Sequence, residues 1–426
     1  MSATGTPASP PSSLPRVLQG LEDSHGPMDL AGHELLHGPL PEVQPERLID
    51  MVERSGLRGR GGADFPTAIK LRAVASRRRM SCVVVNGSET EPASLKDHLL
   101  LARLPHLVLD GALLAAKAVG AGEVIVKLDQ NAVEAAEGLQ QAINQRDSLE
   151  MPISLGIGPD GYVTGEESAV IQFLNGRPAK PRFVPPRPFE RGYRNRPTLV
   201  QNPETLAQIA LVARHGAEWY RELGTAADPG SVLVTISGAV AYPGVYEMAF
   251  GTPMTDLIRA AGGETEPLQA LLVGGYFGTW MPGAPAMDLR LARQELATLG
   301  CSLGAGVIIA LGESACGLHE SARIVDYLAG QSSGQCGPCV HGLAAIAGTF
   351  GALADGVAHG REYERLLRWC TEVRGRGACH HPNGVIRFVE SALHVFHLDL
   401  QTHGAGPCPG RPAGLPLGPQ VGWRSM

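Results

Sequence analysis

Short apolar runs alternate with stretches of helical spacing through the first half of the chain. Residues 82–85 and 123–127 are apolar runs of strand length, whereas residues 107–119 and 132–144 repeat apolar side chains at the spacing of one helical face. Strands that alternate with helices are typical of a parallel sheet, which binds ligands at the carboxyl ends of its strands. The pattern therefore predicts an α/β domain over residues 45–225.

The pattern changes twice after this domain. Residues 226–300 contain two short strands around a tight turn, then one helix and a further strand, located at 232–238, 245–247, 254–261 and 270–275. This order of elements predicts a small β-grasp-like domain. Helical spacing dominates residues 301–403 and predicts a helical bundle, most clearly at 321–328, 339–353 and 384–396.

Both ends of the chain lack hydrophobic periodicity. Residues 1–44 are rich in proline, serine and glycine, and residues 404–426 are rich in proline and glycine. Segments of this composition do not bury enough apolar surface to fold. We therefore expect a disordered arm and a disordered tail.

Charge and hydropathy argue against two classes of function. The formal net charge is −6 with a pI near 6.2, and the sequence has no basic stripe, so nucleic acid is not an expected partner. No segment reaches about 18 consecutive apolar residues, and the first residues lack the pattern of a signal peptide. We expect a cytoplasmic protein, which could lie at the periphery of a membrane complex.

Four glycines and two arginines alternate between residues 56 and 62, and Lys70 follows soon after. Glycines let the backbone approach an anion closely, while arginine side chains and backbone N–H groups bind its oxygens. A helix that opens at Thr67 would direct its N-terminus at the same anion. The loop has the chemistry of a phosphate site, and a flexible surface turn is the alternative.

Three further polar turns carry side chains that can bind a ligand. Residues 86–92 place an amide and two carboxylates after a strand, where they can accept hydrogen bonds from ribose hydroxyls or ring N–H groups. A helix-capping turn is the alternative there. Residues 161–169 pair two glutamates at a helix start, which the helix dipole alone also favours. Residues 196–205 form a polar turn before an apolar helix, or a plain connector.

The eight cysteines lie mostly in the last third of the chain, which favours metal or cluster ligation over a disulfide framework. Cys336 and Cys339 can reach one metal centre from a single turn, and Cys379 can close the cage. Iron–sulfur ligation fits better than zinc because no histidine stands at zinc-finger spacing. A redox dithiol is the alternative. We interpret as ordinary core or surface thiols Cys82, Cys301, Cys370 and Cys408, and as unsupported alternative ligands His341, His380 and His381.

Taken in order, these stretches resemble those of the flavin-carrying, NADH-oxidising subunit of respiratory complex I and of its relatives in NAD-linked hydrogenases and formate dehydrogenases. The match runs from about residue 55 to residue 396 and includes SGLRGRGGADFPT, NGSETEP, GYVTGEESA, RPTLVQNPET and SGQCGPC. It implies a Rossmann-like α/β domain for FMN and NAD(H), a soluble-ligand-binding β-grasp (SLBB) domain, and a helical bundle with one [4Fe-4S] cluster. Hydride would pass from NADH to FMN, and electrons would leave singly through the cluster.

The resemblance also implies roles for individual residues. Those implied at the FMN phosphate are Gly59, Arg60, Gly61, Gly62 and Lys70. Those implied at the flavin and ribityl chain are Asn86, Glu89, Tyr162, Gly165, Glu166 and Asn202, and those facing NAD(H) are Phe65, Glu91 and Glu167. The implied iron ligands are Cys336, Cys339 and Cys379, with Ser333 at the position of the family's first cluster cysteine.

The chain departs from the family pattern on both sides of the implied electron path. Ser333 replaces a cluster cysteine, Ser88 an aspartate and Ala73 an aromatic residue, and residues 340–342 differ from the family after the last cysteine of the motif. The implied cluster is then a [4Fe-4S] cube with one non-cysteine corner, or a [3Fe-4S] cluster. The implied donor is NAD(P)H or a reduced carrier such as ferredoxin. The expected partner is a ferredoxin-like or other iron–sulfur electron-transfer subunit, or a membrane-bound redox protein.

An electron-transfer oxidoreductase subunit is therefore the function that we expect. A non-catalytic scaffold subunit, which keeps the fold without full redox competence, is the alternative. Retention of charged loop residues such as Arg60, Lys70 and Glu91 favours the oxidoreductase, because drift in a scaffold would not spare so many of them together.

Overall fold

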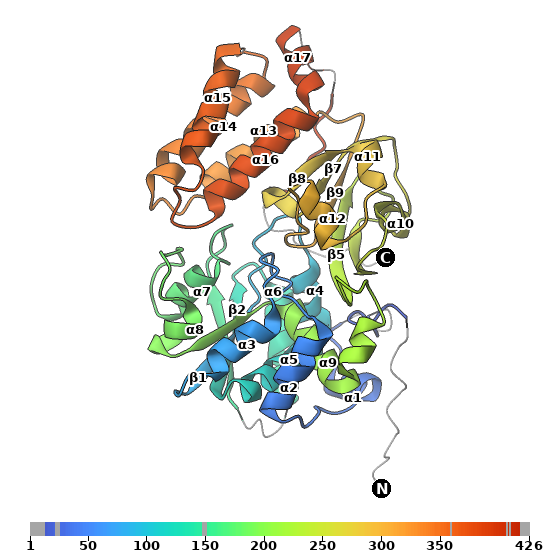
Figure 1. Ribbon diagram of the computed structural model, residues 1–426, viewed down its shortest axis with the longest axis vertical. Coiled ribbons are helices and arrows are strands. Elements are labelled where there is room, and N and C mark those ends of the chain that lie inside the picture. Colours follow the sequence, from blue (N-terminus) through green and yellow to red (C-terminus); the bar gives the residue numbers. More distant parts are fainter. Residues whose placement is uncertain are drawn as a thin grey trace.

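The computed structural model describes residues 13–21, 26–146, 151–357, 360–405, 408 and 410–417. Figure 1 shows three parts: an α/β domain that carries the N-terminal half, a β-grasp domain, and a helical bundle at the end opposite the α/β domain. The predicted fold class, in this order along the chain, is confirmed.

A four-stranded parallel sheet forms the centre of the first domain. Its strand order is β3 (Ile153–Gly158), β2 (Ala121–Asp129), β1 (Ser81–Asn86) and β4 (Thr198–Gln201). The four strands run in one direction, so the polar turns after β1 and β4 meet at one edge of the sheet. The helices of this domain are α1 (Leu30–His37), α2 (Pro45–Ser55), α3 (Thr67–Ala75), α4 (Lys96–Arg103), α5 (Pro105–Ala118), α6 (Val133–Asn144), α7 (Glu167–Leu174), α8 (Pro188–Arg191), η1 (Tyr193–Asn195) and α9 (Pro203–Arg221).

Asp110, on α5, is a buried carboxylate that joins three segments of this domain. Oδ2 lies 2.8 Å from His33 Nε2 on α1 and also binds Arg214 on α9. Oδ1 lies 2.7 Å from Arg146, just after α6. Burial alone raises the pKa of Asp110, but the hydrogen bond to His33 and the charges of Arg146 and Arg214 outweigh it, so this pKa lies well below its usual value.

The second domain is built on a five-stranded mixed sheet. Its strand order is β6 (Gly244–Ala249), β5 (Ser231–Gly238), β9 (Val307–Gly312), β7 (Leu268–Val273) and β8 (Thr279–Pro282). Strand β9 is central and buried along its whole length. The predicted boundary between residues 300 and 301 is therefore wrong, because it separates the central strand from its sheet. The short helices here are α10 (Met254–Ala260), η2 (Gly275–Phe277), α11 (Gly283–Met287) and α12 (Arg293–Thr298).

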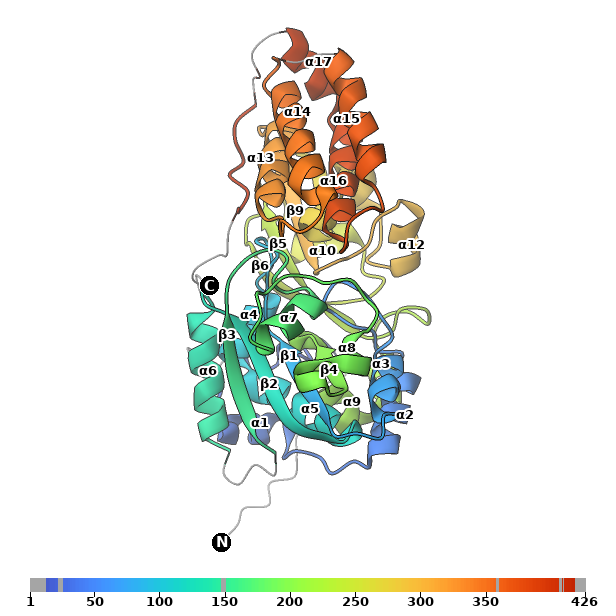
Figure 2. The ribbon, with the colours of Figure 1, turned by 90° about the vertical axis from the view of Figure 1, so that its left-hand side faces the viewer.

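Helices α13 (Gly317–Gly330), α14 (Ala344–Ala354), α15 (Gly360–Val373) and α16 (His381–Val395) form the bundle, as Figure 1 and Figure 2 show. A wide helical turn, η3 (Pro338–Leu343), leads into α14, so the helix predicted over residues 339–353 consists of two parts. Wide turns of this kind are frequent at functional sites, and Cys339 lies in this one. Helix α17 (His397–Ala405) follows α16.

The predicted disordered arm is wrong for the part of residues 1–44 that the structure describes. Glu247 Oε2, on β6, accepts hydrogen bonds from the backbone N–H groups of Arg16, Val17 and Leu18 at 2.7, 2.8 and 3.1 Å. Val17 is fully buried. A buried carboxylate that binds three N–H groups is a specific anchor, which composition does not reveal. Residues 1–12 and 22–25 lie outside the described residues.

The predicted disordered tail is likewise bound to the protein where residues 404–426 are described. Glu320 Oε1, on α13, accepts hydrogen bonds from the N–H groups of Ala413 and Gly414 at 2.9 and 3.2 Å. The hydroxyl of Tyr276 donates to the carbonyl oxygen of Pro416. Glu320 and Tyr276 are both fully buried, so two buried side chains hold this segment. The rest of the tail lies outside the described residues.

The described helices differ in length and hydropathy, the two properties that decide whether a helix can span a membrane. None of them is by itself both long and apolar enough to cross a bilayer. Helices α4 and α5 reach that length and hydropathy together, but they are bent by 96°, and most of their side chains are buried inside the domain.

Candidate functional site

One cleft brings together residues from all three parts of the structure. It has a volume of about 590 Å³ and lies at the carboxyl ends of β1 and β4, with Phe277 from the β-grasp domain and Arg387 from the bundle in its walls. The sequence-predicted residues that line it are Gly59, Gly61, Gly62, Phe65, Lys70, Asn86, Glu91, Tyr162, Gly165, Glu166, Glu167, Asn202 and Cys379.

The glycine-rich loop between α2 and α3 forms one wall of the cleft. The N–H of Gly59 donates to the carbonyl oxygen of Phe65 at 2.9 Å and closes the loop. Gly62 has a φ of 92°, which favours glycine. A Cβ atom on Gly61 would lie 3.2 Å from Cβ of Asn202. The loop therefore presents bare backbone to the cleft, as a phosphate cradle requires.

Arg60 does not line the cleft, so the structure corrects its predicted role at a phosphate. Its buried guanidinium donates to the hydroxyl of Tyr220 and to the carbonyl oxygen of Ser231, both at 3.0 Å. Its backbone N–H donates to Thr205 Oγ1 at 2.9 Å. Arg60 thus joins the glycine-rich loop to α9 and to the start of the β-grasp domain.

Glu89 also lies outside the cleft lining, and it caps a helix. Its carboxylate accepts hydrogen bonds from the N–H groups of Asp97 at 3.1 Å and His98 at 2.8 Å, in the first turn of α4. A carboxylate is favoured there by the free N–H groups and by the helix dipole. The predicted contact of Glu89 with a flavin is therefore replaced by the capping alternative.

Two other predicted flavin residues cap helices and line the cleft as well. Glu166 Oε2 accepts hydrogen bonds from the N–H groups of Ser168 and Ala169 at 2.9 and 3.1 Å, where α7 begins. Asn202 caps α9, and its Nδ2 donates to Asp97 Oδ2 at 2.7 Å. Both side chains are held in place, and two helix N-termini lie at the cleft, where they favour a bound anion.

Lys70 supplies a cation at the same wall. Its Nζ lies 2.7 Å from Glu167 Oε1, and both side chains are about a third exposed. Across the cleft, Asn86 Nδ2 donates to the carbonyl oxygen of Gly165 at 2.8 Å and ties the acidic turn to the end of β1. Lys70 therefore lies near the glycine loop and pairs with the carboxylate of Glu167, so its ammonium group can also bind an anion held by the loop.

Glu91 is a buried carboxyl group in the cleft wall. Its Oε2 accepts hydrogen bonds from the hydroxyl of Tyr162 and the N–H of Tyr276, both at 2.8 Å. Burial raises the pKa of Glu91 to about 7. Among the described residues, neither Oε1 of Glu91 nor Nε2 of Gln201, also in this wall, has a hydrogen-bond partner. Buried polar atoms without partners beside a glycine cradle fit bound FMN, whose polar groups can satisfy them.

We expect Glu91→Gln to flatten the pH dependence of stability near neutrality. The folded protein holds the Glu91 proton up to about pH 7, whereas an unfolded chain releases it near the ordinary pKa of 4.5. The folded state binds more protons between these values, so the wild-type free energy of unfolding falls as pH rises through them. Melting temperatures of both proteins at about pH 5 and about pH 8 check this. Equal changes in the two proteins would contradict it.

Ser88 and Ala73, two of the departures from the family pattern, do not line the cleft. The hydroxyl of Ser88 accepts a hydrogen bond from Nζ of Lys127, which also pairs with Asp129. Lys127 is fully buried. Asp129 therefore balances this buried charge without a carboxylate at position 88.

Three thiols lie together where the bundle meets the cleft. Burial, and then the neighbouring Cys336 and Cys379, raise the pKa of Cys339 to about 11. Burial also acts to raise the pKa of Cys336, but N–H donors from Ala378 and Cys339 outweigh it and lower that pKa. Burial raises the pKa of Cys379, and the N–H of His381, which donates to its sulfur, acts in the opposite direction. Hydrogen bonds from N–H groups to the sulfurs are characteristic of iron–sulfur ligands, so these residues fit a cluster.

Ser333 is buried in the loop before these thiols. Its Oγ accepts a hydrogen bond from Gln335 Nε2 at 3.4 Å, and the same amide donates to the carbonyl oxygen of Pro181 at 2.7 Å. The hydroxyl of Ser332 contacts the thiol of Cys339. This loop therefore offers hydroxyl oxygens, and no thiol, as a fourth ligand.

The cleft also contains residues that the sequence analysis did not single out. Phe277 adds an aromatic ring, and Arg182, Arg187 and Arg387 add three cations. Arg387 donates to the carbonyl oxygen of Phe277 at 3.2 Å. These residues come from three separate segments, so no motif spacing marks them.

Three family models match the chain in the order of its domains. The Nuo51 FMN-binding domain matches residues 52–211, the SLBB domain matches residues 233–275, and the NADH-ubiquinone oxidoreductase-F iron–sulfur binding region matches residues 312–403. The first range contains the glycine-rich loop and the acidic turns, and the last contains all three thiols.

The F subunits of bacterial NADH-quinone oxidoreductases are similar to the chain over most of its length. The Rickettsia typhi protein is 32% identical over 349 residues, which cover 78% of this chain and 83% of the relative. The Escherichia coli protein is 29% identical over 394 residues, with 87% of each chain covered. The Rhizobium meliloti protein, named as an F 2 subunit, is 28% identical over 390 residues, covering 87% of this chain and 92% of the relative.

A solved structure has the same fold over the shared part. It is a chain of an NAD⁺-reducing [NiFe]-hydrogenase in the H2-reduced state, which matches with a TM-score of 0.78 and 32% sequence identity over 84% of this chain. The present chain spans 63% of that hydrogenase chain.

Proposed function

We propose, because the chain belongs to the family of NADH-quinone oxidoreductase F subunits, that its cleft binds FMN beside an iron–sulfur cluster at the base of the bundle. The predicted function, an electron-transfer oxidoreductase subunit that uses FMN, an iron–sulfur cluster and NAD(H), is confirmed by the matching domains and relatives. Which donor reduces this chain is part of the proposal: NAD(P)H, or a reduced carrier such as ferredoxin.

One observation carries the proposal. The glycine cradle, the acidic turns and Cys379 line a single cleft, although they come from different domains. A flavin held by the first two would lie next to a ligand of the cluster. Electrons move efficiently only between neighbouring centres, and this arrangement makes the two centres neighbours.

The side chains of the cleft have separate tasks in this proposal. Lys70 and the bare backbone of Gly59–Gly62 hold a phosphate, and Asn202 and Glu166 are fixed by their caps to orient the ring and ribityl chain. Glu91, with a pKa near neutrality, can keep or release a proton beside the dinucleotide. FMN, when bound, accepts a hydride and gives up electrons one at a time, and the cluster carries them singly.

The spectrum of anaerobically purified protein tests the proposal. We expect flavin and iron–sulfur absorption, release of FMN on denaturation, and both iron and sulfide by chemical analysis. A protein that retains neither flavin nor iron after incubation with excess FMN would overturn it. That result would favour the non-catalytic scaffold, for which the serine at position 333 and the structural role of Arg60 are arguments.

We expect Lys70→Ala to weaken FMN binding about tenfold. A hydrogen bond to a charged group contributes about 1.5–3 kcal/mol, and the partial exposure of Lys70 places it near the lower value. Quenching of flavin fluorescence measures the dissociation constant of the apoprotein. Lys117→Ala, at an exposed position of α5 away from the cleft, is the matched control and should bind FMN like the wild type. Equal affinities in all three proteins would argue against a phosphate at Lys70.

We expect NADH to bind more weakly than the family pattern implies, and Ala73→Tyr to strengthen binding. Ala73 lies one helical turn after Lys70 on the same face of α3, so an aromatic ring there can stack on the dinucleotide. Such stacking contributes about 0.5–1.5 kcal/mol, or roughly two- to tenfold in affinity. Stopped-flow reduction by NADH and by reduced ferredoxin, with Ala73→Ser as control, measures this. Saturation of the wild type at low micromolar NADH would refute a weak site.

We also propose that the chain works within a larger assembly. Its relatives are named as subunits. The partner that takes the electrons would be a ferredoxin-like or other iron–sulfur subunit, and a membrane-bound redox protein would make the chain peripheral to the membrane.

A further inference from the structure

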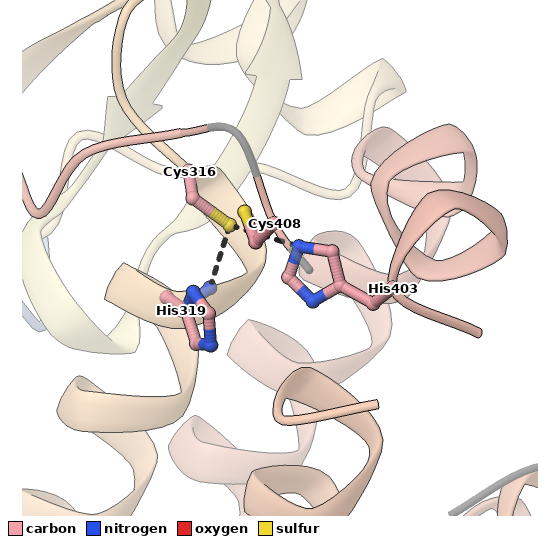
Figure 3. Close-up of side chains that lie close together, drawn as sticks. All are labelled: Cys316, His319, His403 and Cys408. Carbon is pink, nitrogen blue, oxygen red and sulfur yellow. Dashed lines mark hydrogen bonds between the residues drawn. The ribbon is translucent and has the colours of Figure 1, made fainter. Parts of the chain in front are cut away.

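Two cysteines and two histidines meet at the far side of the bundle from the cofactor cleft. Cys316 precedes α13, His319 lies in the first turn of α13, His403 lies on α17, and Cys408 follows α17. One ligand atom from each lies within 4.8 Å of all the others (Figure 3). None of the four lines the cleft. The sequence alone predicts an ordinary core or surface thiol at Cys408.

The ring of His403 is already oriented as that of a metal ligand. Its Nδ1 is hydrogen bonded to the carbonyl oxygen of Ala354, so Nδ1 carries the proton and Nε2 keeps a free lone pair. Nε2 lies 3.4 Å from Sγ of Cys316. In a tetrahedral zinc site, bond lengths of about 2.3 Å to sulfur and 2.0–2.1 Å to nitrogen place these atoms about 3.6 Å apart. The two atoms are thus spaced as neighbouring zinc ligands.

His319 provides a second ring with a similar arrangement. Its Nε2 lies 3.5 Å from Oδ1 of Asp355, which leaves Nδ1 for a metal. A carboxylate behind a ligating histidine is a common second-shell partner. The backbone N–H of His319 donates to Sγ of Cys316 at 3.3 Å, at the N-terminus of α13.

We propose that Cys316, His319, His403 and Cys408 bind one structural zinc ion. Two sulfurs and two imidazole nitrogens form a set that zinc takes in closed tetrahedral sites. Atoms that all lie within 4.8 Å of one another are spaced for a single ion, whereas a two-iron cluster separates its cysteine pair from its histidine pair. Cys316 and Cys408 are free thiols, so no disulfide removes them.

The zinc would join the tail to the N-terminus of α13. The N–H of Cys316 donates to the carbonyl oxygen of Arg411 at 3.0 Å, and the N–H of Arg411 donates to the carbonyl oxygen of Ser314 at 2.9 Å. Cys408 lies just before this pairing, and Glu320 holds the residues just after it. The ion would therefore add a link to a segment that hydrogen bonds already hold at residues 411–414. Its role would be structural, because protein side chains fill all four coordination positions.

Metal analysis of the wild-type protein is the first test. We expect about one zinc per chain after gel filtration, independent of the iron content. Apoprotein titrated with Co²⁺ is expected to show the visible absorption bands of tetrahedral thiolate coordination. Absence of zinc together with absence of these bands would overturn the proposal, as would a Cys316–Cys408 disulfide in protein purified under reducing conditions.

Variants then locate the ion. Cys408→Ser and His403→Gln are expected to weaken Co²⁺ binding by at least about tenfold and to leave bound iron unchanged. Cys301→Ala, which removes a buried thiol of the β-grasp domain, is the matched control and should bind Co²⁺ like the wild type. Unchanged Co²⁺ affinity in Cys408→Ser would refute the site. Cys408 is only partly buried at the edge of the bundle core, and serine keeps nearly its size, so this replacement tests the ligand with little change in packing.

Discussion

Replacing Ser333 by Cys is expected to turn a labile iron–sulfur centre into a stable one. A hydroxyl oxygen is harder and far less acidic than a thiolate, so it ligates iron in a sulfur-rich site poorly. Ser333 is buried, so a thiol there would be shielded from solvent. Loss of a second-shell partner alone changes metal affinity about 10- to 100-fold. Restoring a direct ligand should therefore slow iron loss about 100-fold or more.

Iron and sulfide content followed during exposure to air, with electron paramagnetic resonance of the reduced protein, measures this effect. The wild type is expected to give a [3Fe-4S] signal or that of a cluster with altered potential, and Ser333→Cys that of a conventional [4Fe-4S] cluster. Ser76→Cys adds a thiol at the exposed end of α3 and is the control for a general effect of an extra cysteine. The absence of iron from both the wild type and Ser333→Cys would mean that the three thiols hold no cluster.

Asp110→Asn is expected to lower the free energy of unfolding by about 3–5 kcal/mol, the usual cost of removing one member of a buried ionic group. The side chains of Arg146 and Arg214 are only 8% and 5% exposed, and they would keep their charges without the carboxylate. Hydrogen bonds between α5, α1 and the end of α6 would weaken together. Chemical denaturation of the two proteins at neutral pH measures the difference.

The pH dependence of this difference follows from the low pKa of Asp110. Its contribution to stability is present above the unfolded pKa of 3.8 and is lost as pH falls through the lower folded pKa. The difference between the two proteins should therefore stay constant from neutral pH to about pH 4 and narrow below it. Asp256→Asn breaks an exposed pair with Arg259 and should change stability by less than about 1 kcal/mol. A similarly small effect of Asp110→Asn would contradict the prediction.

The sequence predicted elements where hydrophobic pattern alone determines structure. The runs at residues 82–85 and 123–127 became β1 and β2, because strands buried on both faces are continuous apolar runs. The hydrophobic pattern gave wrong predictions where a contact between residues far apart in the sequence determines the structure. Residues 16–18 are ordered by Glu247, more than two hundred positions away, and β9 belongs to a sheet that began before the predicted boundary.

Most of the residues in the motifs line one cleft, because loops after parallel strands share an edge. The motifs did not give the direction of each side chain. Arg60 and Glu89 stand inside the motifs, yet one points toward the β-grasp domain and the other caps α4. The Cys316 and His403 pair was missed for a different reason. The two residues are 87 positions apart, beyond any ligand spacing that a short motif encodes.

The contact between Tyr276 and the tail sets an order of events during synthesis of the chain. Pro416 follows Tyr276 by 140 residues. Ribosomes add about 5–20 residues per second, so Tyr276 is made roughly 7–28 s before the carbonyl oxygen that its hydroxyl binds. The same tyrosine gives its N–H to Glu91 in the cleft wall. One side chain therefore links the cleft wall to a tail segment that is translated well after it.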